Sequence, residues 1–315
     1  MMICHRVIIF SFVLLFAMAP LAHGAETPPK VRIAYASRSS SAMPQYMAMQ
    51  RGFFKAEGLD VEIIQMNPRL GATAVVNGDV AFATPFTSTF RGVLQGFPMK
   101  LVFIHLKKGP YYVMVRPDIK DVQQLKGKRI GVATIKGTDQ LVAEEMLQAK
   151  GFNPSQIQAV AIGDGPVRMQ ALISGAVEAV CVAPPHDLML KKIGYNALVG
   201  PPEIGLPSAG MLTSDRLIKD NPLVVKRTLK ALLKAQLYIL ENRQETIQTL
   251  IKWLPQPLDI AEHSYDSELK TLTRDGTMTD AEINSIIERI GEKKRPLDEV
   301  RDFSFAREAM KELGK

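Results

Sequence analysis

Two stretches of the chain, VRIAYAS at 31–37 and KRIGVAT at 128–134, both read as strands and lie 97 positions apart. Each is followed by a loop rich in small residues and then by a helical stretch, which ends in RGF at 51–53 and in KGF at 150–152. The first unit then carries an Asn-Gly turn before its next strand, and the second unit carries Ser-Gly at the same offset. The chain therefore contains one strand–helix–strand unit twice.

This duplication predicts two similar lobes. A period near 97 residues is too long for a solenoid, whose repeats span roughly 20 to 50 residues. Two units of this kind indicate an α/β fold in which each lobe is a mainly parallel sheet flanked by helices. Ligands bind where loops leave the carboxyl ends of such strands, so two facing lobes predict a cleft between them.

The N-terminus predicts export from the cytoplasm. Arg6 precedes an uncharged apolar run over 7–19, and Ala22-His23-Gly24 places small residues at the two positions that a signal peptidase reads. The run is shorter than the roughly 18 apolar residues needed to span a bilayer. We therefore expect residues 1–24 to be a cleaved signal peptide and the mature protein to be periplasmic, with a retained anchor helix as the alternative.

Composition and motifs argue against several classes of function. The formal net charge of +7 is spread over short basic clusters without interleaved aromatic residues, so we expect no nucleic-acid partner. Beyond the signal peptide the sequence has one cysteine, Cys181, which lies in an apolar strand and is expected in the core. His105, His186 and His263 lack metal-ligand spacing, and the chain has neither a Gly-x-Ser-x-Gly elbow nor a Walker loop. We expect no metal, no cofactor and no enzymatic activity.

The remaining chain divides into three segments. Residues 25–108 carry the first unit and 109–200 carry the second, with Gly and Pro at the boundaries. Residues 201–315 return the chain to the first lobe and complete it with a mostly helical part. The two crossings between lobes predict a hinge.

Local patterns also predict individual elements. Strands are expected at 59–65, 80–84, 101–105, 111–115, 177–183 and 211–214. Helices are expected at 71–77, 118–125, 222–240, 243–253, 280–290 with Thr279 as N-cap, and 305–313.

The residues at this point resemble a known family, the periplasmic solute-binding proteins of ABC importers that serve nitrate, taurine, sulfonates and thiamine pyrimidine precursors. The most specific stretch is GFFKAEGLDVE at 52–62, followed by NGDV at 77–80, and LKGKRIG at 125–131 is its counterpart in the second lobe. The resemblance implies the two-lobed type II periplasmic binding protein fold, a ligand held between the lobes, and delivery to a membrane permease. It also implies a monomer that captures a small polar or anionic organic solute.

Small hydroxyl residues follow corresponding strands in both lobes, and helices begin directly after them. Backbone N–H groups and hydroxyls there suit a sulfonate, a nitrate, a carboxylate or the polar edge of a heterocycle. The candidate ligand-binding residues at these strand ends are Arg38, Ser39, Ser40, Ser41, Thr84, Phe86, Thr87, Ser88, Gly137, Thr138, Asp164, Pro184 and His186.

Each candidate has a structural alternative. A single serine or threonine in such a loop is often just a helix N-cap, and Arg38 serves equally well as an exposed rim residue. Tyr35, Tyr46 and Phe86 can stack on a flat ligand or pack in the core. At the level of the whole protein, an enzyme on the same fold, of the thiamine-pyrimidine synthase or chorismate-dehydratase-like kind, and a periplasmic sensory module remain open.

Overall fold

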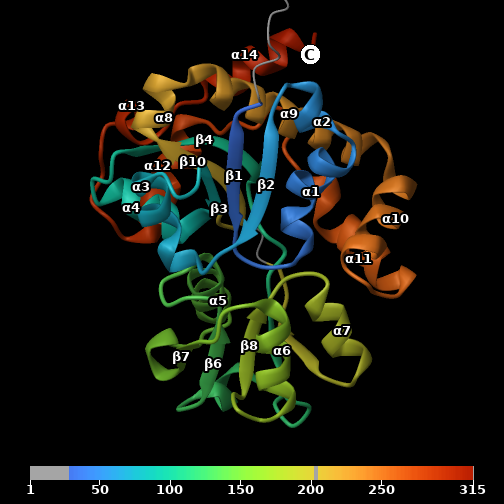
Figure 1. Cartoon of the computed structure of the whole chain (residues 1–315). Coiled ribbons are helices and arrows are strands. Elements are labelled where there is room, and N and C mark those ends of the chain that lie inside the picture. The colour runs from blue at the N-terminus through green and yellow to red at the C-terminus, as the bar shows by residue number, and fades with distance from the viewer. Residues whose placement is uncertain (1–27, 202–204, 315) are drawn as a thin grey trace, which may run out of the picture.

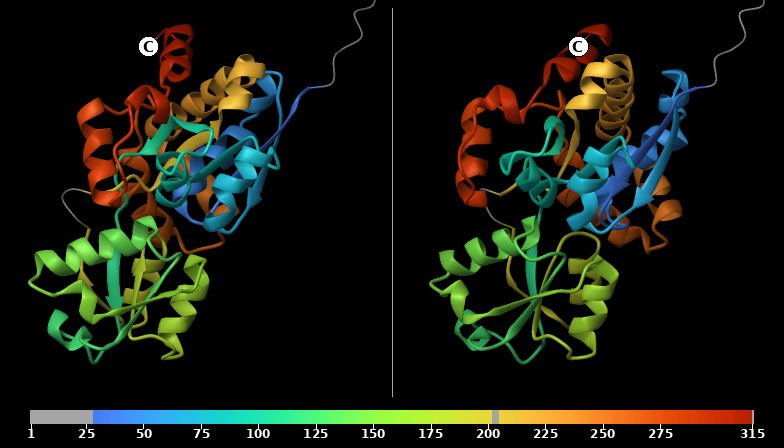
Figure 2. Two further views of the ribbon diagram at one scale, coloured as in Figure 1. Left: turned by 90° about the vertical axis from the view of Figure 1, so that its left-hand side faces the viewer. Right: turned by 60° about the vertical axis from the view of Figure 1, so that its left-hand side comes forward.

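The structure is a computed structural model that describes residues 28–201 and 205–314. Two five-stranded sheets form two lobes, which lie one above the other in Figure 1. Helices flank both sheets, and most of the C-terminal helices surround the first lobe (Figures 1 and 2). The predicted α/β fold with two lobes and a helical C-terminal segment is confirmed. The predicted signal peptide at 1–24 lies outside the described residues.

The two sheets share one topology. The first has the strand order β2-β1-β3-β10-β4 and the second has the order β7-β6-β8-β5-β9. In each sheet three neighbouring strands are parallel, and the fourth, β10 or β5, runs antiparallel to both of its neighbours. The strands are β1 Lys30–Tyr35, β2 Asp60–Gln65, β3 Phe82–Pro85, β4 Met99–Leu106, β5 Tyr112–Val115, β6 Arg129–Val132, β7 Gln158–Ala161, β8 Ala179–Val182, β9 Asn196–Val199 and β10 Ala209–Ser214.

The helices lie on the faces and edges of these sheets (Figure 1). Their bounds are α1 Met43–Gln50, α2 Phe53–Ala56, α3 Gly71–Asn77, α4 Phe86–Leu94, α5 Thr138–Ala149, α6 Gly165–Ile173, α7 His186–Lys192, α8 Asp215–Asp220, α9 Pro222–Glu241, α10 Arg243–Trp253, α11 Leu258–Ser267, α12 Asp280–Ile290, α13 Leu297–Val300 and α14 Ser304–Glu312.

The longest helix, α9, anchors the core of the first lobe. Its apolar face buries Val225, Leu229, Leu232 and Leu233 completely, as the spacing of these residues predicts. The helix packs against α1, α2 and α14. Fully burying one such side chain contributes about 1.5 to 3 kcal/mol, so this face fixes the C-terminal segment to the first lobe.

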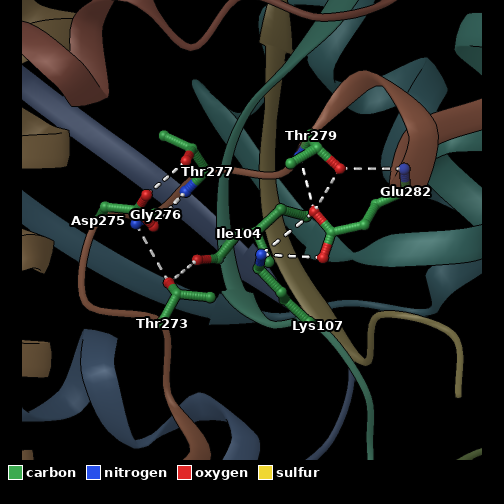
Figure 3. A network of polar contacts seen from close by, with 8 residues as sticks. All are labelled: Ile104, Lys107, Thr273, Asp275, Gly276, Thr277, Thr279 and Glu282. Atoms are coloured by element: carbon green, nitrogen blue, oxygen red, sulfur yellow. Dashed lines mark hydrogen bonds and ion pairs between the residues drawn. The ribbon is translucent and has the colours of Figure 1, made fainter. Parts of the chain in front are cut away.

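The chain crosses between the sheets twice, after β4 and after β9. The first crossing is tied to the C-terminal segment by the polar network in Figure 3. The Thr273 hydroxyl donates to the Ile104 carbonyl at 2.5 Å, and Lys107 binds Glu282 at 2.9 Å. Thr279 and Glu282 form a capping box at the start of α12, which confirms the predicted N-cap. These contacts hold the end of β4 in place where the chain leaves the first lobe.

One prediction of local structure is wrong, and one helix that contributes to the site was not predicted. The stretch 118–125 was predicted as a helix but contains only a short 3-10 turn at Val122–Leu125, because Asp121 and Gln124 close a capping box around one turn. Helix α11, Leu258–Ser267, was not predicted, since prolines at 255 and 257 precede a mostly polar sequence. Within the described residues, no helix is long and apolar enough to cross a membrane.

Candidate functional site

A cavity of about 100 Å³ lies between the two lobes. Its walls come from the loops after β1 and β3 in the first lobe, from the loops after β6, β7 and β8 in the second, and from the crossings. An engineered apolar cavity of ~150 Å³ holds one benzene molecule. In this conformation the cleft therefore has room for a small ligand, of about one ring or less.

Hydroxyl groups line the first-lobe wall. Ser39 and Ser41 follow β1 and bond to each other through their hydroxyls at 2.8 Å. Thr87 and Ser88 follow β3, in the first turn of α4. These side chains are short and carry both a donor and an acceptor, so they suit a polar ligand of either charge.

The hydroxyls of one lobe bond to those of the other. The Thr138 hydroxyl on α5 donates to the Thr87 hydroxyl at 2.6 Å, and the hydroxyls of Ser88 and Thr134 lie 3.2 Å apart. Ser37 in the first lobe donates to Asp164 in the second. Direct contacts of this kind across the cleft define a closed conformation.

These hydroxyls are not helix caps. The N-cap position of α5 is Gly137 and that of α4 is Pro85, and neither has a side-chain capping bond. Ser39 precedes a 3-10 turn and makes no capping bond either. For Ser39, Thr87, Ser88 and Thr138 the capping alternative therefore fails, which leaves these side chains free to act in the cleft.

A buried ion pair forms the base of the second-lobe wall. The Arg168 guanidinium on α6 donates to the Asp139 carboxylate and to the Cys181 carbonyl, each at 2.5 Å. The two charged side chains are 8% and 6% exposed. Burial raises the pKa of Asp139, and the positive charge of Arg168 opposes this shift. The pair adds two charges to the cavity but no net charge.

One nitrogen of this guanidinium has no hydrogen-bond partner in the described part of the chain. This nitrogen, the Arg168 Nε, is buried. A buried donor without a partner costs about 1 to 3 kcal/mol, so a ligand oxygen that reached it would relieve this cost.

His186 closes the same wall at the start of α7. Burial, followed by the nearby Arg168 charge, lowers the pKa of His186 to about 4, so its imidazole is neutral at pH 7. The ring packs directly on Gly165, where an added Cβ would come within 2.5 Å of the imidazole. Gly165 is therefore required for the close approach of α6 to this ring.

Glu268 reaches the cavity from the first lobe, one residue after α11. Its side chain bonds to the Ser40 hydroxyl. Burial is the main reason that the pKa of Glu268 rises to about 7; the bond from Ser40 opposes the shift and the charge of Asp187 adds to it. A carboxyl group that titrates near neutral pH thus faces the ligand space.

The sequence-predicted site residues fall into two groups in the structure. Those that line the cavity are Ser39, Ser41, Phe86, Thr87, Ser88, Thr138 and His186. Those that lie outside this lining are Arg38, Ser40, Thr84, Gly137, Asp164 and Pro184. Arg38 is exposed and outside the lining, while Ser40 and Asp164 form bonds that join the lobes. Tyr46 stacks on Trp253 with ring centroids 4.7 Å apart and belongs to the core.

Sequence reasoning missed the charged residues of the site. Arg168 and Asp139 lie within helical stretches and gave no motif, and Glu268 follows a helix that was not predicted. Tyr111 and Ser208 on the two crossings also line the cavity. Arg168 and Asp139 could have been found by comparing the two repeats position by position, because the first repeat has uncharged residues at the corresponding positions.

The two lobes and the polar cavity between them define the fold class of this protein, which is the periplasmic-binding-protein fold. The solved structure of the alkanesulfonate-binding protein SsuA from Xanthomonas axonopodis pv. citri, bound to MOPS, superposes with a TM-score of 0.73. The two proteins are 18% identical, and the match covers 88% of this chain and 99% of SsuA. At this identity the likeness establishes the fold.

Residues 39–246 match the family model described as NMT1/THI5 like, and the chain belongs to this family. One relative, YtlA of Bacillus subtilis, carries the name of a binding protein and is 27% identical over 77% of this chain and 75% of its own length. Another, a 4-amino-5-hydroxymethyl-2-methylpyrimidine phosphate synthase of Saccharomyces cerevisiae, is 25% identical over 68% of each chain. The relatives thus include both binding proteins and synthases.

Proposed function

We propose that this chain is the periplasmic substrate-binding component of an ABC importer, which captures a small polar organic solute between its lobes and delivers it to the permease. The observation that carries the proposal is the hydroxyl-lined cavity between the lobes, which is built from matching loops of both and spanned by hydrogen bonds between them. The proposed lobes are 25–108 with 201–315, and 109–200, and the proposed binding residues are those that line the cavity.

The charges that line the cavity favour some classes of ligand over others. A sulfonate or a nitrate needs positive charge, but Asp139 neutralises Arg168 and Glu268 contributes a further carboxyl group. A pyrimidine-type compound with neutral donors and acceptors suits these groups better. We therefore rank a pyrimidine-type ligand ahead of the free anions for this cleft.

Native mass spectrometry of protein purified from the periplasm of its host tests the binding role directly. We expect a bound small molecule, and a mature chain that starts at Ala25 or within a few residues of it. A thermal-shift panel with an aminopyrimidine, an alkanesulfonate and nitrate then tests the ranking. Stabilisation by the anions alone would reject the ranking, whereas full-length chain in the membrane fraction would reject the proposed export.

The lobes should also move. Solution scattering is expected to show a more compact particle once the identified ligand saturates the protein, because the closed form joins the lobes through several hydrogen bonds. An unchanged particle size at saturation would reject hinge closure.

A synthase is the second candidate, because one relative in this family is named as a pyrimidine phosphate synthase. Mass-spectrometric detection of a new product formed from candidate substrates by the purified protein separates this activity from simple binding.

A further inference from the structure

Glu268 takes part in a bridge between the two lobes. Its side chain is 1% exposed and bonds to the hydroxyl of Ser40, which lies in the first lobe after β1. The same Ser40 hydroxyl lies 3.0 Å from the Pro184 carbonyl, which belongs to the second lobe. The three groups therefore form a chain from the first lobe to the second at the edge of the ligand cavity.

The number of protons shared by these three hydrogen-bonded groups decides whether Glu268 is charged. The Pro184 carbonyl can accept a hydrogen bond but cannot donate one, so its bond uses the single proton of the Ser40 hydroxyl. An ionised Glu268 would have to accept this same proton from Ser40. Because the hydroxyl has no second proton, the two contacts can exist at once only if the carboxyl group supplies the proton between Ser40 and Glu268. Both bonds exist together only when Glu268 is protonated.

The surroundings of Glu268 also disfavour a negative charge. Among the ion pairs of the described residues, none includes Glu268. Asp187 on α7 and Tyr111 before β5 interact electrostatically with Glu268, and His186 on α7, Arg168 on α6 and Asp139 on α5 line the same cavity. Arg168 is paired with Asp139, and His263 binds Asp187 at 2.8 Å, so neither forms an ion pair with Glu268.

We propose that the closed cleft holds Glu268 in its neutral form, so that closure of the lobes takes up a proton. When the carboxyl group loses this proton, the Ser40 hydroxyl can satisfy only one of its two acceptors, and the bond to the second lobe competes with the bond to the carboxylate. Closure is then favoured at acidic pH and disfavoured at alkaline pH. This inference rests on the opening and closing of the proposed binding cleft, but not on the identity of its ligand.

The expected effect is large. In the closed form burial raises the pKa of Glu268 from 4.5 to about 7. We expect opening to expose the carboxyl group to water and so to return its pKa toward 4.5. This difference corresponds to a change of roughly 300-fold in the ratio of closed to open protein across the titration. The ratio falls as the pH rises from about 4.5 to 7 and is constant above that range.

Solution scattering of the ligand-free protein at pH 5 and pH 8.5 tests the proposal, with protons as the only ligand. We expect wild-type protein to be more compact at pH 5. Glu268→Gln keeps a neutral donor next to Ser40, so its particle size is expected not to change with pH. An equal size of the wild-type particle at both pH values, or the same change in Glu268→Gln, would overturn the proposal.

A matched control uses a carboxylate that joins the lobes through an ion pair. Glu145 on α5 binds Arg289 on α12 at 2.8 Å, and Glu145→Gln is expected to keep the pH response of the wild type. If this control loses the response, closure depends on general charge and the assignment to Glu268 is wrong.

Infrared spectra of the wild type supply a second measurement, because the carbonyl band of a protonated carboxylic acid should persist at pH 6 and be missing in Glu268→Gln. A failure of the importer function would instead appear as the absence of a bound solute.

Discussion

Strand β3 of the first lobe and strand β8 of the second, at 82–85 and 179–182, keep the 97-residue offset of the repeat without any shift. At the same offset, Ser37 and Ser41 correspond to Thr134 and Thr138, so a hydroxyl recurs at both positions. The framework and part of the lining of the cleft thus follow directly from the duplication.

The same offset also shows where the two walls differ. Ala42 and Gly71 of the first lobe correspond to Asp139 and Arg168 of the second. A Cβ on Gly71 would come within 2.8 Å of the Thr89 hydroxyl, so the first lobe has no room for a side chain there. The second lobe places a buried ion pair at these two positions. The repeat therefore specifies the scaffold, and the positions at which its copies differ specify the chemistry.

Removal of Arg168 is expected to have the largest effect on stability and binding, because it breaks the buried ion pair with Asp139 in the second-lobe wall. Arg168→Ala leaves the Asp139 carboxylate buried and unpaired, which should lower the free energy of unfolding by about 3 to 5 kcal/mol and abolish ligand binding. Urea unfolding at pH 7 measures the first effect and calorimetric titration with the identified ligand measures the second.

The control is a double variant that makes the second-lobe wall as uncharged at these two positions as the first-lobe wall. Asp139→Ala combined with Arg168→Ala removes both charges, so it should recover part of the lost stability but none of the binding. Equal stability of the single and the double variant would show that the unpaired Asp139 carboxylate costs nothing in this site, and would remove the contrast between the walls.

The scaffold could be predicted from the sequence because it depends on patterns that repeat. Strand and helix periods, turn glycines and the Thr279 cap are local signals, and they located most elements to within about two residues. Glu268 could not be predicted, because it reaches the cavity through the packing of α11, whose sequence lacks a clear apolar stripe. Arg38 was a predicted ligand contact because of its place in the serine loop, and the structure leaves it exposed and outside the cavity lining.

A second test compares one buried histidine from each lobe. His105 in the first-lobe core and His186 in the second-lobe wall both have a pKa lowered to about 4, mainly by burial. The folded state thus binds fewer protons than the unfolded state between about pH 6.5 and 4, so each histidine lowers stability as the pH falls through this range. The loss is on the order of 3 kcal/mol per histidine at the acidic end.

Urea unfolding of His105→Asn and His186→Asn at pH 7 and pH 5 measures these contributions relative to the wild type, which cancels the opposite contribution of Glu268. Each variant is expected to lose less stability than the wild type on acidification. Because only His186 lines the cavity, ligand affinity should change in His186→Asn and stay constant in His105→Asn. A change of affinity in His105→Asn alone would contradict the assignment of the two histidines.

The smallest expected effect concerns the hydroxyls that the two walls share. Thr138→Ala removes the bond to Thr87 across the cleft, so ligand affinity should weaken by about 0.5 to 1.5 kcal/mol through a less stable closed form. Thr138 makes no capping bond, so the melting temperature of the ligand-free protein should stay unchanged.

Thr279→Ala is the matched control, because Thr279 caps α12 through a bond from the Glu282 N–H at 3.2 Å and lies outside the cavity lining. This control should lose about 1 kcal/mol of stability and no affinity. If Thr138→Ala behaves like Thr279→Ala, its hydroxyl stabilises the helix rather than the closed cleft, and the two walls do not meet through their hydroxyls in solution.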